Sequence, residues 1–396
     1  RCNESDITSG TDEKMKTFTV KLKHGTYDLA IIANARTAVN AADFQGKTKA
    51  EAVALLTESM PTDGKWIASP AATGYKPIPM WGDLGKDKTA VTIQENTSIT
   101  DIKLLRMMAR VDVTITADNF KLSSVYVYQY HKTGAIAPLD ANLDAATKTK
   151  AEKPTLPGSV VTTEGPLEYI GNGVVTDKSC STEIYLFESQ NLKNDGTAKG
   201  LLERTCVVVG GKFGTDTEDS FYRVDFSSGS GTKQQFLNIL RNHKYMFHIT
   251  KVAGPGYPDK ETAYQSEPFN IEAEVLEWND ADMNEIIFNG QYYVSFSGKE
   301  MHFDPWGDAL NTHEITVKTN VSDFALFDFV NTAGVGGSWT ESPKGTWSNE
   351  HFTVKFTEKS SSGDNKEYTI TAEAKETAED DVAREITFNM KGANLS

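Results

Sequence analysis

Cysteine is scarce in this chain, with three among 396 residues, at positions 2, 180 and 206. So few cysteines exclude the disulfide framework of a small secreted domain, and the absence of a CxxC pair argues against a zinc site. Long apolar runs are also missing, since a run such as residues 29–35 is far shorter than the roughly 20 residues of a membrane-spanning helix. Basic residues are outnumbered, with 40 Lys and Arg against 55 Asp and Glu, a net charge of −15. This balance disfavours a nucleic-acid partner.

Catalytic signatures are absent as well. The sequence contains no GxSxG elbow, no GxxxxGK[ST] phosphate loop, no GxGxxG and no HExxH. With 55 acidic residues, some carboxylate pair has the spacing of a glycosidase by chance, and no local context singles one out. The sequence therefore predicts no enzyme, no cofactor and no metal site.

What the sequence does contain is alternation. At 396 residues it exceeds the roughly 250–300 at which one hydrophobic core stops growing, so two or three domains are expected. Apolar residues recur with a period of two, as at Val111, Val113 and Ile115, which indicates strands with one buried face. Residues 17–23 show the same pattern. Short alternating strands separated by turn residues predict an all-β fold of packed sandwiches.

Four segments depart from simple alternation. Fully apolar runs at residues 184–187 and 206–209 predict central strands that are covered on both faces. One helix is expected over residues 48–60, because Thr48 and Glu51 form a capping box and Val53, Leu56 and Met60 follow at helical steps. Residues 133–166 have no lasting period and are predicted to be a long surface excursion.

Isolated polar residues receive structural interpretations. Cys180 and Cys206 are predicted to be core thiols, with one bridge between neighbouring strands as the alternative. His243 and His248 are five positions apart on a predicted strand, so they point to opposite faces and cannot share a metal. Residues 216–219 lack the register of a calcium loop and are expected at an exposed hairpin tip.

Seven segments, in order, resemble the Bacteroidetes fimbrillin superfamily, the Mfa-like and FimA-like pilins. The segments are residues 25–35 (GTYDLAIIANA), 79–82 (PMWG), 105–113 (LRMMARVDV), 184–188 (IYLFE), 222–226 (YRVDF), 239–245 (ILRNHKY) and 278–280 (WND). Each has a structural interpretation. The pair Asn34-Ala35 suits a turn, and Arg241-Asn242 precedes a strand where their side chains can bond loop carbonyls.

The resemblance implies two transthyretin-like β-sandwiches in tandem, over residues 1–104 and 105–290. Residues 291–396 resemble a BACON-like immunoglobulin-type module, through Trp339 and segments at 314–320, 352–356, 368–374 and 383–388. The implied function is a non-enzymatic fimbrial subunit, or a tip or accessory adhesin, that joins other pilin subunits by donor-strand exchange. Host glycan, mucin or protein is the implied adhesion target. The alternative is a surface glycan- or mucin-binding lipoprotein whose C-terminal module binds the sugar.

Family pilins are exported to the cell surface as lipoprotein precursors, so the resemblance implies contact with the outer membrane only through a lipid anchor. Cys2 is the candidate for lipidation, although Arg1 stands where a small residue is normal. The family also implies that a leader strand is removed, which leaves a groove. Phe18, Val20, Leu22, Tyr27 and Leu29 are the candidates for lining it.

Three tryptophans gather in the last quarter of the chain. Trp306, Trp339 and Trp347 are candidates for a sugar-stacking platform. The other interpretation makes them core anchors of a small sandwich, because buried tryptophan is common in such folds.

Overall fold

The fold is known from a computed structural model. It describes residues 7–9, 16–36, 39, 44–83, 90–94, 97–99, 102–145, 148–158, 165–171, 173–228, 234–279, 285–288, 293–298, 300–303, 312–319, 326–331, 338–339, 345–348, 352–362, 365–374 and 384–391. The described residues are almost entirely β, as the alternation predicts. None of their helices is long and apolar enough to span a membrane.

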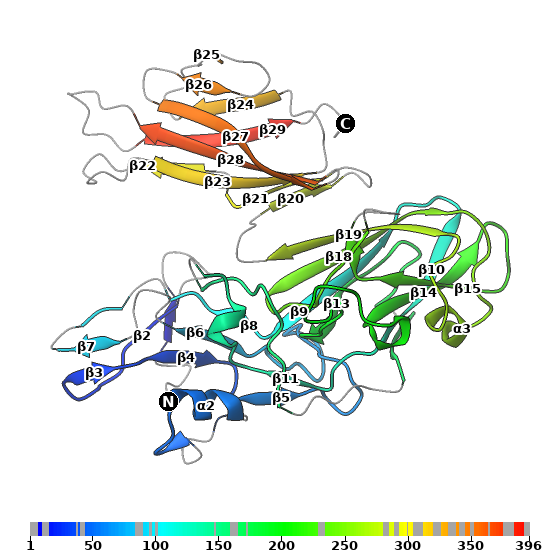
Figure 1. Ribbon diagram of the computed structural model, residues 1–396. Coiled ribbons are helices and arrows are strands. Elements are labelled where there is room, and N and C mark those ends of the chain that lie inside the picture. The colour runs from blue at the N-terminus through cyan, green and yellow to red at the C-terminus, as the bar shows by residue number, and fades with distance from the viewer. Residues whose placement is uncertain are drawn as a thin grey trace.

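The N-terminal region, residues 7–106, is built from short strands (Figure 1). Its ladders join at most three strands, in the orders β1-β2, β3-β7, β4-β6-β8 and β5-β11. The elements are β1 (Ile7–Ser9), β2 (Lys16–Phe18), β3 (Gly25–Tyr27), β4 (Ala30–Ala33), α2 (Lys49–Leu55), β5 (Thr57–Ser59), β6 (Met80–Asp83), β7 (Val91–Ile93) and β8 (Leu105–Arg106), with β11 (Thr133–Ala135) added from later in the chain.

Helix α2 begins where the sequence predicts and ends sooner. Thr48 accepts a hydrogen bond from the Glu51 backbone N–H, and the Glu51 carboxylate accepts one from the Thr48 backbone N–H. The expected extension to Met60 is wrong, because the helix ends at Leu55 and β5 follows. Leu56 and Met60 are still buried, but they reach the core from the helix end and from the strand rather than from one helical face.

The central sandwich consists of two four-stranded sheets, in the orders β12-β10-β14-β15 and β13-β9-β18-β19. β9 and β18 pair in parallel, and the other ladders of the two sheets are antiparallel. The strands are β9 (Met108–Ile115), β10 (Phe120–Tyr128), β12 (Leu167–Ile170), β13 (Ser179–Phe187), β14 (Cys206–Phe213), β15 (Ser220–Asp225), β18 (His243–Val252) and β19 (Ile271–Asn279).

The alternating residues of these strands fill the core between the two sheets. Val111, Val113 and Phe247 have no exposed surface, as the period of two predicts. Residues 206–209 are buried on both faces, and β14 is an inner strand, so this prediction is confirmed. β13 was expected to be central and is instead the edge strand of its sheet. Its outer residues are covered by the N-terminal region, where Phe187 packs edge-on against Trp66.

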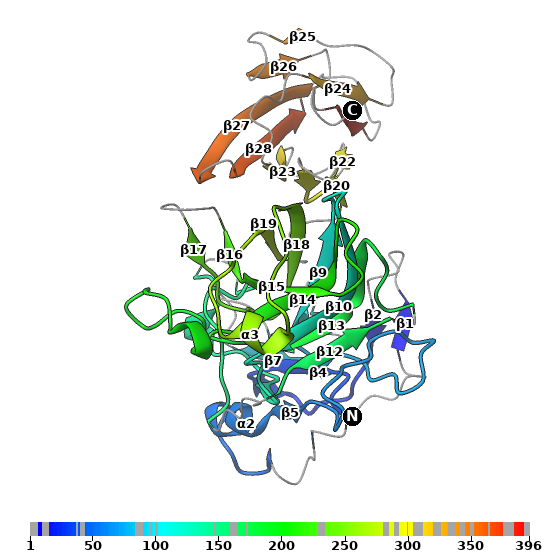
Figure 2. The same ribbon diagram turned by 90° about the vertical axis from the view of Figure 1, so that its right-hand side faces the viewer.

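Short elements cover the outer face of the β12-β10-β14-β15 sheet. Helix α3 (Lys260–Tyr264) lies on it (Figure 2) and buries Ala263 against Tyr126, Tyr128 and Val208. The turn η3 (Leu201–Glu203) lies nearby, and the hairpin β16 (Ser227–Ser228) and β17 (Gln235–Phe236) extends from the end of β15. Both faces of this sheet are therefore packed.

The C-terminal sandwich pairs a seven-stranded with a three-stranded sheet, in the orders β20-β21-β23-β28-β27-β26-β25 and β22-β29-β24. Ile315, Val354 and Tyr368 are among its buried residues. The strands are β20 (Glu285–Phe288), β21 (Tyr293–Phe296), β22 (Glu300–Phe303), β23 (Thr312–Thr319), β24 (Leu326–Asn331), β25 (Ser338–Trp339), β26 (Thr346–Ser348), β27 (Phe352–Ser362), β28 (Asn365–Ala374) and β29 (Arg384–Lys391).

The predicted surface excursion at residues 133–166 is wrong for its described part. β11 pairs with β5, and Ile136 and Ala137 are buried beside Trp66 and Trp81. Further along, the turn η2 (Asp140–Asn142) leads to a bridge between Leu143 and Ala151, both of which are buried. The segment lacks periodicity because side chains and carbonyls of other elements hold it in place, rather than a sheet of its own.

Candidate functional site

The N-terminal apolar segment, residues 16–23, carries alternating apolar side chains that face solvent. Phe18, Val20 and Leu22 are 37%, 50% and 45% exposed. The strand predicted over residues 17–23 is wrong in extent, because the ladder with β1 ends at Phe18 and residues 19–23 join no described strand. An amphipathic stretch that continues a short strand without a ladder of its own is a candidate for pairing with another strand.

The other two groove candidates lie in and after the next strand. Tyr27, in β3, stands opposite Val91, and its hydroxyl donates a 2.9 Å hydrogen bond to the Lys23 carbonyl. Tyr27 and Leu29 are half-buried. The structure therefore brings Tyr27 to the end of the N-terminal apolar segment, and leaves Phe18, Val20 and Leu22 as the exposed apolar row.

A buried ion pair forms an interdomain joint between the N-terminal region and the central sandwich. Glu188 follows β13 and Arg241 precedes β18, and both side chains are excluded from solvent. The Arg241 Nη2 and Nε donate to Glu188 Oε2 at 2.7 and 3.0 Å, and the Arg241 backbone N–H donates to Oε1 at 3.1 Å. Thr155 adds a fourth hydrogen bond from its backbone N–H. The carboxylate is thereby well satisfied, as a buried charge requires.

The same guanidinium reaches the strand that completes the N-terminal region. Arg241 Nη1 donates to the Ile136 carbonyl at 2.8 Å, and Nη2 donates to the Ala135 carbonyl at 3.0 Å. Ala135 belongs to β11, and the Ile136 backbone N–H donates to Leu56. The prediction that this side chain bonds loop carbonyls is confirmed. The joint therefore fastens β11, and through it β5 and Leu56, to the central sandwich.

Neighbouring groups brace the joint. His131 Nδ1 lies 2.7 Å from the Glu188 carbonyl, and His243 Nδ1 lies 2.7 Å from the Arg241 carbonyl. Burial lowers the pKa of His131 below 6.5 and that of His243 to about 4. Asn242, at a left-handed φ of 58°, accepts hydrogen bonds from the backbone and guanidinium of Arg106. Asn34, at φ 60°, makes the predicted turn and donates to the Ile78 carbonyl.

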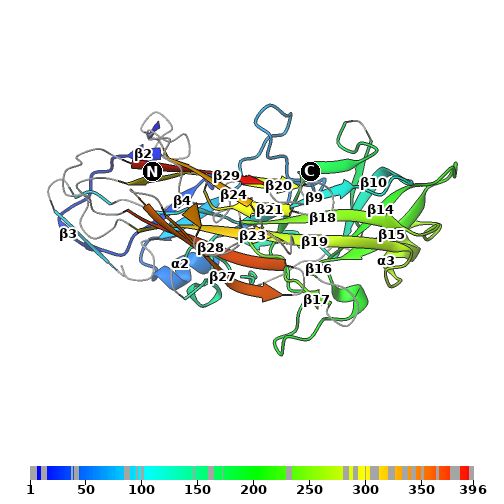
Figure 3. The same cartoon turned by 90° about the horizontal axis from the view of Figure 1, so that it is seen from above.

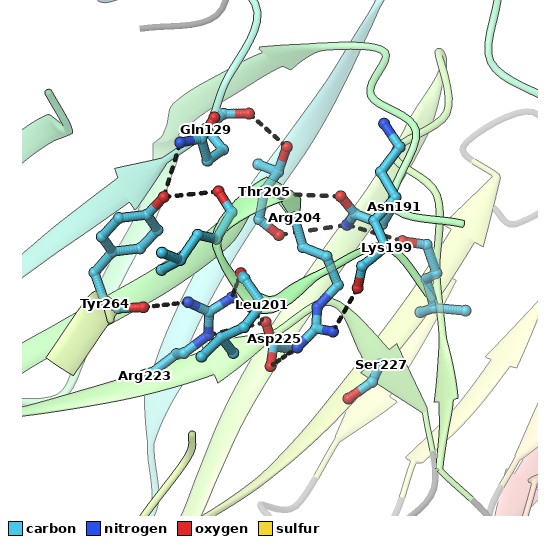
Figure 4. Close-up of polar contacts among 12 residues, drawn as sticks. Gln129, Asn191, Lys199, Leu201, Arg204, Thr205, Arg223, Asp225, Ser227 and Tyr264 are labelled. Carbon is cyan, nitrogen blue, oxygen red and sulfur yellow. Dashed lines mark hydrogen bonds and ion pairs between the residues drawn. The ribbon is translucent and has the colours of Figure 1, made fainter. Parts of the chain in front are cut away.

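A second polar cluster lies on the outer face of the α3-covered sheet (Figure 4). Arg223 Nε and Nη2 donate to Asp225 Oδ1 at 3.1 and 2.8 Å, and its other donors reach the carbonyls of Leu201 and Tyr264. Arg204 Nη2 donates to Asp225 Oδ2 at 3.3 Å. These contacts tie η3 and α3 to the sheet, so the cluster holds connecting segments in place.

The sequence Arg-Val-Asp that builds this cluster occurs twice. In β9, Arg110 Nε and Nη2 donate to Asp112 Oδ1 and Oδ2 at 3.0 and 2.7 Å, and Lys244 pairs with the same carboxylate. Side chains two residues apart share one face of a strand, so Arg-x-Asp on a strand forms an ion pair outside the core. A spacing of two residues within a predicted strand is the sequence signal that could have indicated the Arg110–Asp112 and Arg223–Asp225 ion pairs. The Glu188 partner of Arg241 had only a weak signal, an acidic residue directly after an apolar strand.

Thiols, histidines and acidic loops provide no chemical site in the described part of the chain. Cys180 and Cys206 are free and buried, on different sheets, and burial raises the pKa of each to about 12. They are the predicted core thiols. Of residues 216–219, the first three are exposed at the hairpin tip between β14 and β15, as expected, whereas Asp219 is half-buried and accepts a hydrogen bond from the Ser123 hydroxyl. No three His, Cys, Asp or Glu side chains gather as a metal-binding group among these residues.

The remaining candidates are placed as follows. Cys2 and Trp306 lie outside the described residues. Trp339, in β25, stands opposite Trp347, in β26, in an antiparallel ladder. Trp347 is 3% exposed, so its ring packs inside the C-terminal sandwich and presents no open face to a sugar.

No family model matches the chain, and no curated protein does. Among solved structures, the chain is similar to the tip fimbrial protein Mfa3 from Porphyromonas gingivalis, in a form with a C-terminal truncation. The identity is 14%, the TM-score is 0.38, and the match covers 67% of this chain and 88% of that chain. It is also similar to a candidate cell adhesion protein from Bacteroides eggerthii, with 16% identity, a TM-score of 0.35 and coverage of 63% and 77%.

Proposed function

We propose that this protein is a non-enzymatic, cell-surface fimbrial subunit or a fimbria-associated adhesin that assembles by β-strand addition. The observation that carries the proposal is the exposed apolar row of Phe18, Val20 and Leu22, on a segment whose ladder with β1 ends at Phe18. The seven ordered segments that resemble the fimbrillin superfamily support the same function. The described residues form packed sandwiches and buried ion pairs, which are structural features rather than catalytic ones.

The physical basis of assembly is the pairing of an extended segment with a neighbour's strand. A partner strand beside residues 16–23 satisfies backbone N–H and C=O groups and covers the apolar row. Removing each half-exposed apolar side chain from water contributes roughly 1 kcal/mol. These three side chains and a ladder of hydrogen bonds favour strand addition, and the entropy lost on ordering residues 19–23 opposes it.

The C-terminal sandwich suits a tip or accessory position in the fimbrium rather than the shaft. The resemblance implies that a shaft subunit keeps a C-terminal strand free for exchange, whereas β29, the last strand described here, lies between β22 and β24 in a three-stranded sheet. We propose export as a lipoprotein precursor, with Cys2 as the lipidated residue and a host glycan, mucin or protein as the adhesion target. Glycan binding by the C-terminal sandwich alone has less support, because Trp347 is buried.

The test is immunogold labelling of native surface filaments with antibody to this protein. Label on filaments, at the tip or at intervals, is the expected result. Protein found in the outer membrane with no label on any filament would overturn the fimbrial role and favour the alternative of a surface lipoprotein.

Strand addition is tested separately, with the intact chain and extended peptides of alternating apolar and acidic residues. A peptide that pairs with residues 16–23 raises the melting temperature in proportion to the logarithm of its concentration once it is in excess. The control peptide has its apolar positions replaced by Ser. Equal shifts with both peptides, or no shift with either, would contradict strand addition at this segment.

A further inference from the structure

We infer that β19 is a mechanical release in this protein: under tension it peels from β18, and the parallel pair of β9 and β18 then arrests further opening. The inference rests on the proposed tip or accessory position, in which tension runs between the N-terminal region and the C-terminal sandwich. That tension passes along the chain, so it enters the central sandwich at β9 and leaves it at β19.

The order of the strands places both points of attachment at one end of the sheet β13-β9-β18-β19. The N-terminal region leads through β8 into the start of β9, and residues 280–284 connect the end of β19 to β20. Lys244, near the start of β18, stands opposite Arg110 of β9 and opposite Trp278 of β19. β9 and β19 are therefore antiparallel, and the start of one lies beside the end of the other, as the views in Figures 1 and 3 allow the reader to follow.

Tension at these two points opens the ladder between β18 and β19 from its end. Force on the end of β19 acts on one pair of residues at a time, starting with Asn279 and His243, so the ladder hydrogen bonds break in succession. A bulge between Ile249 and Lys251 interrupts the same ladder further along. Opening in succession needs less force than breaking the same bonds together.

β19 also contributes less to the core than the inner strands do. Ile271 and Ala273 are only partly buried, and Glu272 is 63% exposed, in an ion pair with the equally exposed Lys251. Val275 is buried, and β16 lies against β19. In β9, by contrast, six of the eight residues are buried. Separating β19 from the sheet therefore exposes less apolar surface than separating β9.

The connector between β18 and β19, residues 253–270, is the next part to take the tension. It includes α3, which is held to the other sheet of the central sandwich. Ala263 is buried there, and the Tyr264 carbonyl accepts a hydrogen bond from Arg223 (Figure 4). Because α3 has only five residues, this attachment is short, and we expect the connector to follow β19.

Release of β19 and the connector changes the direction in which the sheet is pulled. Tension then arrives at Val252, the last residue of β18, which lies at the opposite end of the sheet from the start of β9. The two parallel strands are now pulled past each other along their length. Their six paired positions, Arg110–Ile115 and Lys244–Ile249, must yield together, so the sheet resists.

Hydrogen bonds outside the ladder reinforce both ends of β18. The Thr116 hydroxyl and backbone N–H donate to the Ile249 carbonyl at 3.2 and 3.0 Å, and Asn119 Nδ2 donates to the Val252 carbonyl at 2.9 Å. At the start of the strand, Arg241 fastens it to the N-terminal region through the interdomain joint. The strand that takes the tension second is thus held at both ends.

The test is to pull on the full chain with optical tweezers, through handles at two engineered cysteines. The native direction uses Lys103→Cys, which precedes β9, and Asp282→Cys, which follows β19. The N-terminal region and the C-terminal sandwich then lie outside the stretch under tension. The second direction replaces Asp282→Cys by Pro268→Cys, at the start of β19, and so loads the strands along their length from the outset. Lys103 and Pro268 are both exposed.

The handles must attach only at the engineered positions. Cys180 and Cys206 are buried with no exposed surface, so they stay unlabelled in the folded protein. Cys2→Ser removes the remaining thiol. Melting curves that match the wild type establish that each chain is folded before it is pulled.

In the native direction we expect a release at low force, in one or two steps, before the central sandwich unfolds. Residues 253–279 add about 90 Å of chain when they are freed and extended. In the second direction this release is absent, and the first event needs at least about threefold more force, because six pairs break together. Relaxation after the first release restores β19, since the sheet to which it returns is still folded.

Three variants separate the release from the arrest. Val275→Ala removes the buried side chain of β19 and lowers the force of the first event alone. Thr116→Val keeps the shape of the side chain but removes the hydroxyl bond to Ile249, and it lowers the force of the later event alone. Lys153→Ala, at an exposed position outside both ladders, is the matched control and changes neither force.

Three outcomes would overturn the inference: a single event that unfolds the whole central sandwich in the native direction, equal first forces in the two directions, or a first event that responds to Thr116→Val and not to Val275→Ala. The immunogold experiment is independent of these. Label on filaments combined with any of the three leaves the fimbrial role standing and removes the release. A release at low force with no label on any filament overturns the fimbrial role alone.

Discussion

The central sandwich and the N-terminal region bury the apolar faces of their strands in different ways. The central sandwich closes a core between two four-stranded sheets from its own residues. The core of the N-terminal region instead gathers Trp66 and Trp81 together with Ile136, Ala137 and Phe187, which come from elements after residue 106. The core of the central sandwich is thus built from that sandwich's own residues, whereas the core of the N-terminal region includes side chains from segments that follow it in the sequence.

The difference shows why the two regions are joined by a buried ion pair. Ladders of two or three short strands are marginal on their own in water. The interdomain joint compensates, because Arg241 binds the carbonyls of β11 and thereby holds the strand that pairs with β5. What the N-terminal region keeps open is the opposite side, where residues 16–23 face solvent. Under the proposed strand addition, the residues that stabilise this region and the residues that join it to a partner belong to different segments.

The largest expected effect is on the closed core. Val113→Asp puts an unpaired charge where no surface is exposed, and we expect a loss of more than about 4 kcal/mol in the free energy of unfolding. Thr114→Asp, on the other face of the same strand, is the matched control and costs less than about 1.5 kcal/mol. Urea denaturation measures both. Equal losses would mean that β9 has its faces reversed.

The next effect is on the joint. Arg241→Met leaves the Glu188 carboxylate buried without its cation, and we expect a loss of about 3–5 kcal/mol. The double variant R241M/E188M recovers part of it, because no charge is then stranded. Asp28→Asn, which removes the exposed ion pair with Lys49, costs less than about 1 kcal/mol. A double variant no more stable than R241M would show that the carbonyl contacts, rather than the ion pair, carry the joint.

Acid is expected to destabilise the fold through buried histidines at the joint and on β18. Burial lowers the pKa of His243 and His248 to about 4, against 6.5 in the unfolded chain, and lowers that of His131 as well. The folded state then binds fewer protons, so the stabilisation is complete above pH 6.5 and is lost as the pH falls towards 4. Chemical denaturation between pH 7 and 4 measures this loss. His243→Gln, which keeps a donor for the Arg241 carbonyl, should make the dependence shallower; an unchanged slope would exclude His243 as a source.

The smallest effect is expected at the open edge. Val20→Ser and Leu22→Ser remove apolar groups that are already half in water, so the unfolding free energy of the monomer changes by less than about 0.5 kcal/mol. Val125→Ser, in the central core, serves as the contrast and costs several times as much. Thermal melts at low concentration separate the two. A large loss from Leu22→Ser would mean that the N-terminal apolar segment is already packed in the monomer.

The sequence predicts the strands of the central sandwich well because each alternates strictly, as at Val111, Val113 and Ile115, and burial enforces that pattern. It predicts the start of α2 for a similar reason, since Thr48 and Glu51 need only each other. The end of the helix is missed because β11, more than 70 residues later, draws Thr57–Ser59 into a ladder. Nothing local in residues 57–60 encodes that partner.

The same reasoning explains the two polar features. Arg223 and Asp225 lie two residues apart, so their pairing is visible in the sequence once a strand is assumed. Glu188 and Arg241 are 53 residues apart, and only the fold brings them together. The candidate groove residues follow from the fimbrillin resemblance, and the alternation of Phe18, Val20 and Leu22 identifies a face but does not tell whether another strand covers it.

The parallel pairing of β9 with β18 also has a consequence for the time course of folding. Thr116 binds the carbonyl of Ile249, 133 residues further along the chain, and β9 is an inner strand that no earlier element can flank on that side. Closing so long a loop costs conformational entropy before the native contacts form and offset it. Topologies rich in contacts between distant residues therefore fold slowly. During synthesis, β9 and β10 must wait with their apolar faces uncovered until β18 emerges. A chain that is exported unfolded has β18 available before it folds. A chain that stays at its site of synthesis needs a chaperone to cover the apolar faces of β9 and β10.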